Sequence, residues 1–409
     1  MSEAHFKERL VQVDLPTHHY ALITAPDGRF LATVNDELIV TTVTDDAAIW
    51  DWRNNELVNV TSGKTLSTSM IDSGVHLTFD GQPVNKIGEI GTPATFTIGH
   101  GPEKMPSEYL EFFQAHGWVC LTSILPPDVL EELERVSCTD RYQDRKFDTS
   151  APPFNQSPAM AKTAAEPVSL WLMRRYMQTD EIRLGHTPSL AIVGKDDGKR
   201  NVQGWHSDFP YLWGISGSIN EGRETIPDGR VPTPSGPTVL GVQRNVCISP
   251  FTGVGGATAF KLGSRDKDRG PPHDWGTGTS HGRPGYRAEH GLPYTGENAD
   301  IVEAPGGSII LYDSRTWHRA GINRTEKRRS AMLQAMIPMY IMPFYDLSAS
   351  YKSFLKSDAY QALNERERDE MRRLMVHYMA GPGGLQAITV DQELTEHVKD
   401  SGARWGAYS

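Results

Sequence analysis

The alternation of hydrophobic and polar positions is strongest near the start of the 409-residue chain. Residues 18–98 contain short alternating stretches, such as YALITAPDGRFLATV, ELIVTTV and VHLTF, which are separated by Gly, Pro, Asn and Asp. This pattern predicts short β-strands joined by turns. We therefore expect a small all-β domain over residues 1–100.

Two stretches within this part resemble each other. DGRFLAT at 27–33 and SGKTLST at 62–68 share a turn signal followed by a strand pattern, which indicates a repeated β-hairpin unit. The repeat resembles those of β-trefoil modules of the lectin or fascin type, although such modules carry three copies. The domain is therefore expected to be trefoil-like or a hairpin repeat. It would bind a carbohydrate or a partner, or serve as a structural appendage.

The pattern changes after GHGPEKMP at 99–106, a Gly- and Pro-rich junction. Three stretches then place apolar residues at helical spacing: SEYLEFFQAHGW, PPDVLEELERVS and WLMRRYMQTDEI. From about 186 to 345, apolar strands follow one another with long loops and no helices between them. Parallel βαβ units need such helices, so we expect a double-stranded β-helix over 105–345, that is, a cupin-like jelly roll with flanking helices.

Two further segments complete the predicted organisation. Residues 264–298 are too long and too rich in Gly and Pro for a plain turn, so they are either a lid-like loop over the barrel mouth or a passive insertion. Residues 357–381 have an amphipathic helical pattern that begins at Ser357 and stops at Gly381. They predict a C-terminal helical extension over 346–409.

Composition narrows the classes of partner. The chain is 38% hydrophobic and 22% charged, as is ordinary for a globular protein, and no long apolar run or signal-peptide pattern is present. A net charge of −10 without a Lys/Arg stripe argues against nucleic acid. Cys120, Cys138 and Cys247 are too scattered for a disulfide framework, which suits packing in a reducing compartment. We expect a cytoplasmic protein that acts on a small molecule without nucleic-acid or membrane partners; its oligomeric state is left open.

Candidate chemistry lies in GWHSDFPY at 204–211. On a strand, His206 and Asp208 point to the same face, and an unpaired buried carboxylate is costly unless a cation neutralises it. His318 follows an apolar strand and an aspartate-bearing turn, so it could face the same cavity. Two histidines and one carboxylate with open positions suit non-haem Fe(II) better than a closed zinc site.

A nearby arginine adds an anion site. Arg329 begins the apolar strand SAMLQAMI and could clamp a carboxylate through two hydrogen bonds. Its neighbour Arg328 would take that place if the strand register slipped by one. Iron beside an anchored dicarboxylate is the equipment for oxygen activation with 2-oxoglutarate.

Residues 107–345 resemble the phytanoyl-CoA dioxygenase family of Fe(II)/2-oxoglutarate-dependent oxygenases. The resemblance is carried, in chain order, by EYLEFFQAHGWVCLTSIL, WHSDFPY, GVGGATAFKLGSR and APGGSIILYDSRTWHRAGINRTEKRR, and WHSDF also resembles the ectoine hydroxylase branch. It implies that Fe(II) is held by His206, Asp208 and His318, that Arg329 binds the distal carboxylate of 2-oxoglutarate, and that Thr258 contacts this cosubstrate.

The resemblance further implies a dioxygenase that uses O2 to hydroxylate or desaturate an unactivated C–H bond of a small molecule, with release of succinate and CO2. Asp208 favours this over halogenation, because related halogenases lack the carboxylate. Ala320 and Arg265 depart from the family pattern and put the substrate in doubt. The alternatives are a non-catalytic jelly-roll binding or regulatory protein with a carbohydrate- or partner-binding β domain, and a zinc cupin-like isomerase or hydrolase, which would not need Arg329.

Aromatic residues near the first histidine are candidates for a substrate pocket. Phe209, Tyr211 and Trp213, together with Trp205, could line such a pocket or belong to the core. The histidines of the long loop, His273, His281 and His290, are expected to be solvated rather than metal ligands.

Overall fold

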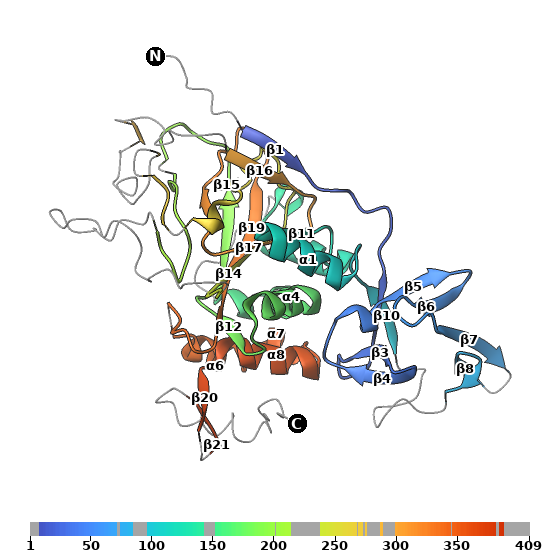
Figure 1. Ribbon diagram of the computed structural model, residues 1–409. Helices are drawn as coiled ribbons and strands as arrows, with labels where there is room; N and C mark the ends of the chain where they lie inside the picture. The colour runs from blue at the N-terminus through green and yellow to red at the C-terminus, as the bar shows by residue number, and fades with distance from the viewer. Residues whose placement is uncertain are drawn as a thin grey trace.

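Two facing β-sheets form the centre of the molecule. The computed structural model describes residues 8–71, 74–84, 96–142, 152–200, 202–213, 238–267, 269–272, 275, 287–288, 299–344, 346–381 and 384–387. The major sheet has the order β11-β17-β14-β19-β12, with β13 also paired to β19, and the minor sheet has the order β1-β16-β15-β18. Apart from β1, which runs parallel to β16, all of these pairs are antiparallel. The predicted jelly roll is confirmed (Figure 1).

The strands of both sheets are short, except for β19. The major sheet contains β11 (Trp118–Leu121), β12 (Ile182–Leu184), β13 (Ser189–Val193), β14 (Val242–Cys247), β17 (Ser308–Asp313) and β19 (Arg329–Pro338). The minor sheet contains β1 (Glu8–Gln12), β15 (Ala259–Lys261), β16 (Ala299–Glu303) and β18 (Trp317–Arg319).

Alternation along the major-sheet strands separates two cores. Ile310 and Ala331 belong to a cluster with minor-sheet residues such as Phe260, in the space between the sheets. Their sequence neighbours Leu311 and Met332 belong to a second cluster with residues of the helices. Because successive side chains of a strand point to opposite faces, one apolar run supplies both cores. The barrel interior is thereby closed on one side by the minor sheet and supported on the other by a helical layer.

The helices lie mainly on the outer side of the major sheet. They are α1 (Pro106–His116), α2 (Pro127–Val136), α3 (Pro158–Ala164), α4 (Pro167–Met177), α6 (Ser348–Phe354), α7 (Asp358–Gln361) and α8 (Glu365–Met375), with 3-10 turns η1 (Asp46–Ala48), η3 (Asp140–Tyr142), η4 (Pro153–Asn155) and η5 (Ser264–Asp266). The helical spacing of SEYLEFFQAHGW is matched by α1, which ends at Gly117, whose φ of 73° suits glycine.

The prediction of one continuous helix over 357–381 is wrong. Asn364 accepts a hydrogen bond from the Glu367 backbone, while the Glu367 side chain accepts one from the Asn364 backbone, so a capping box starts α8 anew after α7. Beyond Met375 the chain turns into the hairpin of β20 (Tyr378–Gly381) and β21 (Gly384–Ala387).

The N-terminal strands form a separate antiparallel sheet in the order β4-β3-β2-β5-β6-β7-β8-β9, with β10 paired to β2. The strands are β2 (Ala21–Thr24), β3 (Phe30–Val34), β4 (Glu37–Thr41), β5 (Trp50–Arg53), β6 (Glu56–Asn59), β7 (Thr65–Ile71), β8 (Gly74–Phe79), β9 (Gln82–Pro83) and β10 (Thr97–His100). Gly28 and Gly63, with φ of 90° and 71°, precede β3 and β7. The two similar stretches therefore occupy equivalent places, each a glycine turn leading into a strand.

This N-terminal sheet is not isolated from the jelly roll. Leu22, Phe30 and Ile49 belong to the same core cluster as the helices of the major sheet. Strand β1, which precedes the small sheet in sequence, pairs with β16 of the minor sheet instead (Figure 1). The division at about residue 100 stays a prediction, but the first described strand belongs to the barrel.

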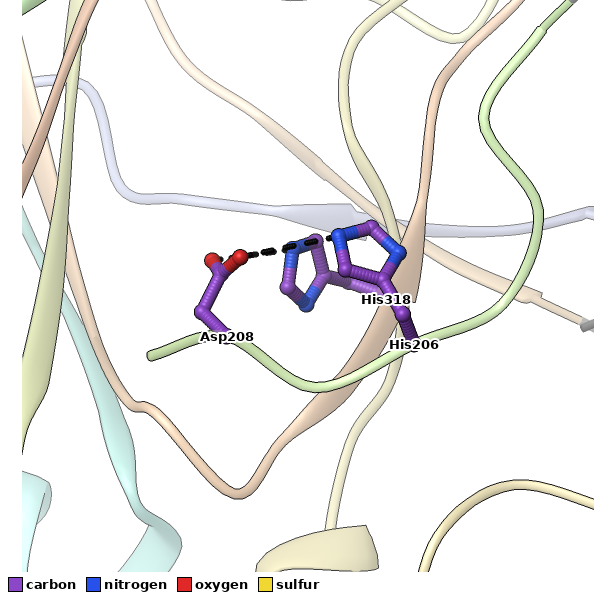
Figure 2. Close-up of side chains that lie close together, drawn as sticks. All are labelled: His206, Asp208 and His318. Atoms are coloured by element: carbon purple, nitrogen blue, oxygen red, sulfur yellow. Dashed lines mark ion pairs between the residues drawn. The ribbon is translucent and has the colours of Figure 1, made fainter. Parts of the chain in front are cut away.

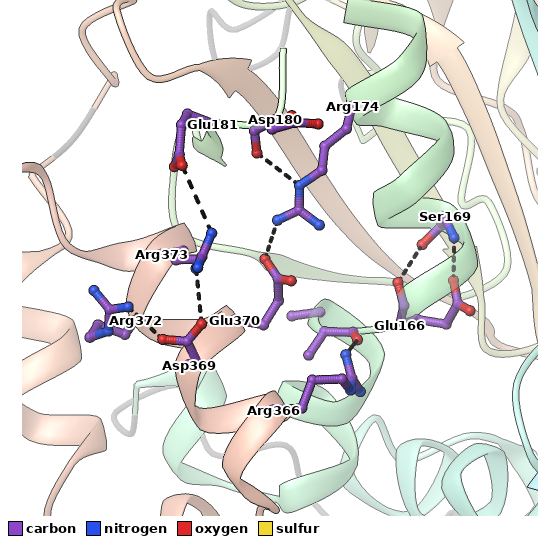
Figure 3. A network of polar contacts seen from close by, with 12 residues as sticks. Glu166, Ser169, Arg174, Asp180, Glu181, Arg366, Asp369, Glu370, Arg372 and Arg373 are labelled. Carbon is purple, nitrogen blue, oxygen red and sulfur yellow. Dashed lines mark hydrogen bonds and ion pairs between the residues drawn. The ribbon is translucent and has the colours of Figure 1, made fainter. Parts of the chain in front are cut away.

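An ionic network fastens α8 to α4 (Figure 3), and a backbone hydrogen bond joins α8 to the N-terminal sheet. Arg174 of α4 pairs with Glu370 of α8, and Arg373 lies 2.9 Å from Asp369. The backbone N–H of Arg366 donates to the carbonyl of Asp27 over 2.9 Å. The C-terminal helix thus contacts both the helical layer and the turn before β3.

None of the described helices combines the length and the apolar content needed to cross a lipid bilayer. The three cysteines are free and buried, in keeping with the packing role predicted for them.

We expect Glu370→Gln to lower the free energy of unfolding and to make this free energy depend less on pH between neutral and acidic conditions. Burial alone would raise the pKa of Glu370, but the Arg174 guanidinium outweighs burial and holds it below the usual range. A carboxyl with a lowered folded-state pKa stabilises the protein above its unfolded pKa, and this stability is lost as pH falls. Loss of the charge should cost up to about 3 kcal/mol at neutral pH. Urea unfolding between neutral and acidic pH measures both effects.

Asp180→Asn is the matched control, since the ion pair of Asp180 with Arg175 is largely exposed. It should change the free energy of unfolding by less than about 1 kcal/mol. Equal destabilisation by both variants would contradict a special role for the α4–α8 pair.

Candidate metal centre

His206, Asp208 and His318 converge at one place (Figure 2). The backbones of His206 and His318 form an antiparallel bridge in which each N–H donates to the other's carbonyl over 2.9 Å. Their ring centroids are 4.2 Å apart. Nε2 of His318 lies 3.1 Å from Asp208 Oδ2, and Nε2 of His206 lies 3.5 Å from Oδ1. Atoms able to bind a metal, one from each residue, all lie within 4.8 Å of one another.

Hydrogen bonds on the outer side of each ring determine which nitrogen faces the centre. Nδ1 of His206 lies 2.8 Å from the Gly204 carbonyl, and Nδ1 of His318 lies 3.0 Å from the Thr316 carbonyl. A carbonyl only accepts, so each Nδ1 must carry the hydrogen. In the neutral rings both Nε2 atoms therefore present lone pairs towards Asp208. Two such nitrogens and a carboxylate are a donor set that fits a divalent transition metal.

Asp208 is held as an anion. Burial alone would raise the pKa of its carboxyl, but in the absence of a metal the positive charge of a protonated His318 and hydrogen bonds from both protonated rings hold it well below the usual range. The Tyr312 hydroxyl donates to Asp208 Oδ2 over 3.3 Å. The side chain of Asp208 is 27% exposed, whereas those of His206 and His318 are 3% and 7% exposed. The cluster is thus open on the carboxylate side and closed behind the imidazoles.

The barrel interior continues from this cluster through polar and aromatic side chains. Tyr312 packs edge-on against Phe260 and against His318, with ring centroids 4.9 and 5.2 Å apart. Asn245 donates to the Thr258 hydroxyl over 3.2 Å. Thr258 precedes Phe260 by two residues, so both side chains lie on the interior face. The predicted cosubstrate contact at Thr258 stays a prediction, but the residue lies in the right part of the barrel.

Arg329 is a buried cation inside the barrel. It pairs in register with Val193, and its side chain is enclosed, with the residue only 7% exposed. Its Nε donates to the Gly256 carbonyl over 3.1 Å, and its guanidinium lies 5.2 Å from the centroid of Phe251. Burial lowers its pKa to about 10. Among the described residues, no carboxylate forms an ion pair with it.

Arg328 points the other way. Its guanidinium donates to the Cys138 carbonyl over 2.8 Å, and its backbone N–H donates to Asp140. The strand register therefore selects Arg329 as the interior residue, and the alternative of a slip by one does not occur.

The aromatic residues proposed for a substrate pocket differ in exposure. Tyr211 and Trp213 are 0% and 1% exposed and pack on each other with centroids 5.2 Å apart. Trp205 is also enclosed and packs against Trp275. Phe209 is partly exposed, and its ring lies 5.7 Å from that of Phe344, centroid to centroid. A substrate contact stays a prediction for all three of Phe209, Tyr211 and Trp213, and only Phe209 offers free surface.

The described part of the long 264–298 segment packs beside the histidines rather than on them. Trp275 lies 5.8 Å from Trp317, centroid to centroid, and Arg287 forms a buried pair with Asp196. Most of the segment, including His273, His281 and His290, lies outside the described residues, so its role as a lid stays a prediction.

The two departures from the expected motif have structural explanations. Arg265 donates to the Gln114 and Ala115 carbonyls at the end of α1, over 2.7 and 2.8 Å, and thus caps that helix. Ala320 packs against a small cluster of Val202 and Ile322. Neither residue contacts the three metal-binding candidates through a side-chain hydrogen bond.

Sequence reasoning missed Tyr312, the residue that hydrogen-bonds Asp208. It stands in the apolar run SIILYD, where an aromatic residue reads as core. A tyrosine at the inward-facing end of such a strand, six residues before a candidate ligand, was the available signal.

A jelly roll whose interior holds two histidines, one carboxylate and a buried arginine defines a non-haem metal enzyme of the oxygenase type. The model of the family described as Phytanoyl-CoA dioxygenase (PhyH) matches residues 113–331, just over half of the chain. The protein belongs to the phytanoyl-CoA dioxygenase family. The predicted class, an enzyme that depends on Fe(II), 2-oxoglutarate and O2, is thereby confirmed.

Solved structures with similar folds are distant. The epimerase SnoN in complex with Fe3+, alpha ketoglutarate and nogalamycin RO has 14% identity and a TM-score of 0.38, over 57% of this chain and 84% of its own. HygX from Streptomyces hygroscopicus, with nickel and 2-oxoglutarate bound, has 18% identity and a TM-score of 0.40, over 61% and 93%. No curated protein matches the sequence. Similarity at this level does not indicate a substrate.

We expect Tyr312→Phe to weaken divalent metal binding by about tenfold. Outer hydrogen bonds to ligating groups typically contribute tenfold to a hundredfold in affinity, and the 3.3 Å contact places Tyr312 at the lower end. Calorimetric titration of the metal-free protein with Co2+ measures the change. Tyr109→Phe is the control, because Tyr109 is 2% exposed but contacts none of the three residues. Equal affinities for wild type and Tyr312→Phe would contradict the expectation.

Proposed function

We propose that the protein hydroxylates, or desaturates, an unactivated C–H bond of a small molecule, with conversion of 2-oxoglutarate and O2 to succinate and CO2. The observation that carries the proposal is the presence of Arg329 in the same barrel interior as the three convergent metal-binding candidates. A buried guanidinium without a carboxylate partner among the described residues is suited to an anionic ligand.

In this proposal His206, Asp208 and His318 hold Fe(II) on one side. When bound, the iron supplies the oxygen activation that protein side chains cannot provide. The Gly204 and Thr316 carbonyls keep each Nδ1 protonated and each Nε2 available. Neighbouring apolar groups, Phe260 among them, limit the entry of water from the barrel side.

Arg329 would orient the cosubstrate. Its Nε is engaged with the Gly256 carbonyl, which fixes the guanidinium, and no described residue accepts a hydrogen bond from its terminal nitrogens, which leaves them for a carboxylate. An arriving anion would offset the cost of burial that lowers the Arg329 pKa. Thr258, on the same interior face, is proposed as a second polar contact to 2-oxoglutarate.

The substrate class is proposed only as a small molecule, and the choice between hydroxylation and desaturation stays open. Phe209 is proposed to border the substrate because it follows Asp208 directly and is partly exposed. A cytoplasmic location stays a prediction.

The first experiment is metal and cosubstrate binding under argon, followed by O2-dependent release of succinate. Wild type should bind Fe(II) and 2-oxoglutarate and release succinate on exposure to O2, while His206→Ala should lose metal binding and succinate release. A wild-type protein that binds neither iron nor 2-oxoglutarate would overturn the proposal in favour of the non-catalytic binding protein.

We expect Arg329→Ala to raise the dissociation constant of 2-oxoglutarate by about 30- to 100-fold in the Fe(II)-loaded protein. The loss corresponds to about 2–3 kcal/mol, as is typical for hydrogen bonds to a charged group. Arg329→Lys should recover part of it, because a lysine keeps the charge but not the paired hydrogen bonds. Anaerobic calorimetry measures these constants without a substrate.

Arg328→Ala is the matched control, one residue away on the opposite face of the strand. It should leave the 2-oxoglutarate affinity unchanged. If both alanine variants weakened the affinity equally, Arg329 would not be the anchor.

A further inference from the structure

Three successive carbonyls of the turn over residues 313–316, between β17 and β18, contact Asp208, its neighbour Ser207 and His318. The Ser314 carbonyl accepts from the backbone N–H of Asp208 over 3.0 Å. The Arg315 carbonyl accepts from the Ser207 hydroxyl over 2.9 Å. The Thr316 carbonyl lies 3.0 Å from His318 Nδ1. One short turn thus positions the carboxylate, the residue between the first two candidates, and the second imidazole.

A buried ion pair holds this turn together. The Asp313 carboxylate, which is fully enclosed, accepts from the Arg315 backbone N–H over 2.9 Å. It also accepts from Nε of Arg315 over 2.9 Å and from Nη2 over 2.7 Å. The Asp313 carbonyl accepts from the backbone N–H of Thr316 over 2.9 Å. The side chains and the backbone therefore close the same four residues into one rigid unit.

The ion pair of Asp313 with Arg315, called the clamp below, is anchored in the helical layer. The Tyr176 hydroxyl, from α4, donates to Asp313 Oδ2 over 3.0 Å. Arg265 donates to that hydroxyl over 2.7 Å and also caps the end of α1. One cation, Arg315, and one hydroxyl, that of Tyr176, thus contact the Asp313 carboxylate. Through the Tyr176 hydroxyl, Arg265 connects the turn to α1 and α4.

We propose that Asp313 and Arg315 are positioning residues of the metal centre, which act by fixing the three carbonyls of the 313–316 turn. This inference rests on the proposed function, because it assumes that a metal binds to His206, Asp208 and His318. Neither Asp313 nor Arg315 is placed on the metal itself. Without the clamp, the turn keeps its backbone path but loses the bonds that hold its carbonyl directions.

A purely structural ion pair is the competing explanation, and the chain contains a matched control. Arg244 of β14 is as fully enclosed as Asp313, at 0% exposure. It donates to Gln334, to Ser169 and to the Ala164 carbonyl, on the helical side of the major sheet. Removal of Arg244 should destabilise the fold without affecting the carbonyls around the metal centre.

The test is a titration of the metal-free full-length protein with Co2+, read by its visible ligand-field absorption. Wild type, Asp313→Asn, Arg315→Lys and Arg244→Met are compared well below their melting temperatures. We expect both turn variants to raise the Co2+ dissociation constant by about tenfold to a hundredfold, as loss of outer hydrogen bonds to metal ligands does. Their absorption at saturation should also differ from wild type. Arg244→Met should melt earlier but keep the wild-type affinity and spectrum.

Arg315→Lys is the milder variant, because it keeps the charge and the fold. The inference would be overturned if Arg315→Lys kept the wild-type Co2+ affinity and spectrum. It would also be overturned if Arg244→Met weakened Co2+ binding as much as the turn variants do. If Asp313→Asn does not fold, Arg315→Lys alone carries the test. Failure of the wild-type protein to bind Co2+ would overturn the proposed function together with this inference, whereas binding by wild type with unaffected turn variants would overturn the inference alone.

Discussion

The reciprocal backbone bridge between His206 and His318 is the interaction on which the rest of the site depends. Two residues that exchange both hydrogen bonds face each other directly, so their side chains emerge on the same side. Asp208 follows two positions later and returns to that side. A shift of one residue in the pairing would turn an imidazole out of the barrel. The flanking sheets, the 313–316 turn and the helical layer all hold this single register.

Two buried arginines differ in how many hydrogen-bond acceptors surround them, and this difference separates a structural role from a proposed binding role. Arg244 and Arg329 are both enclosed arginines whose pKa burial lowers to about 10. Arg244 donates to several neutral acceptors and is satisfied within the protein. Among the described residues, Arg329 donates only to Gly256. The first arginine is therefore part of the fold, whereas the second is the one proposed to bind an anion.

Much of the site could be predicted from local sequence. The two-residue spacing of His206 and Asp208 predicts that both side chains lie on one face of a strand. The lack of helices between the apolar strands predicts a jelly roll. The choice between Arg328 and Arg329 could not be made locally, because it depends on the pairing of β19 with β13. The roles of Tyr312, Asp313 and Arg315 depend on partners from distant elements. For the same reason, the capping box at Asn364 was hidden within an apparently continuous helical pattern.

Strand β1 has a consequence for the order in which the chain can fold. Its partner β16 is made almost three hundred residues later, and the Arg9–Asp300 contact spans 291 positions. During synthesis the small N-terminal sheet can form early, while the strand ahead of it must wait, unpaired, until β16 has left the ribosome. Contacts of such long range form slowly and leave a strand edge open in the meantime. Completion of the minor sheet is thus a late event that joins the first described strand of the protein to its metal-binding half.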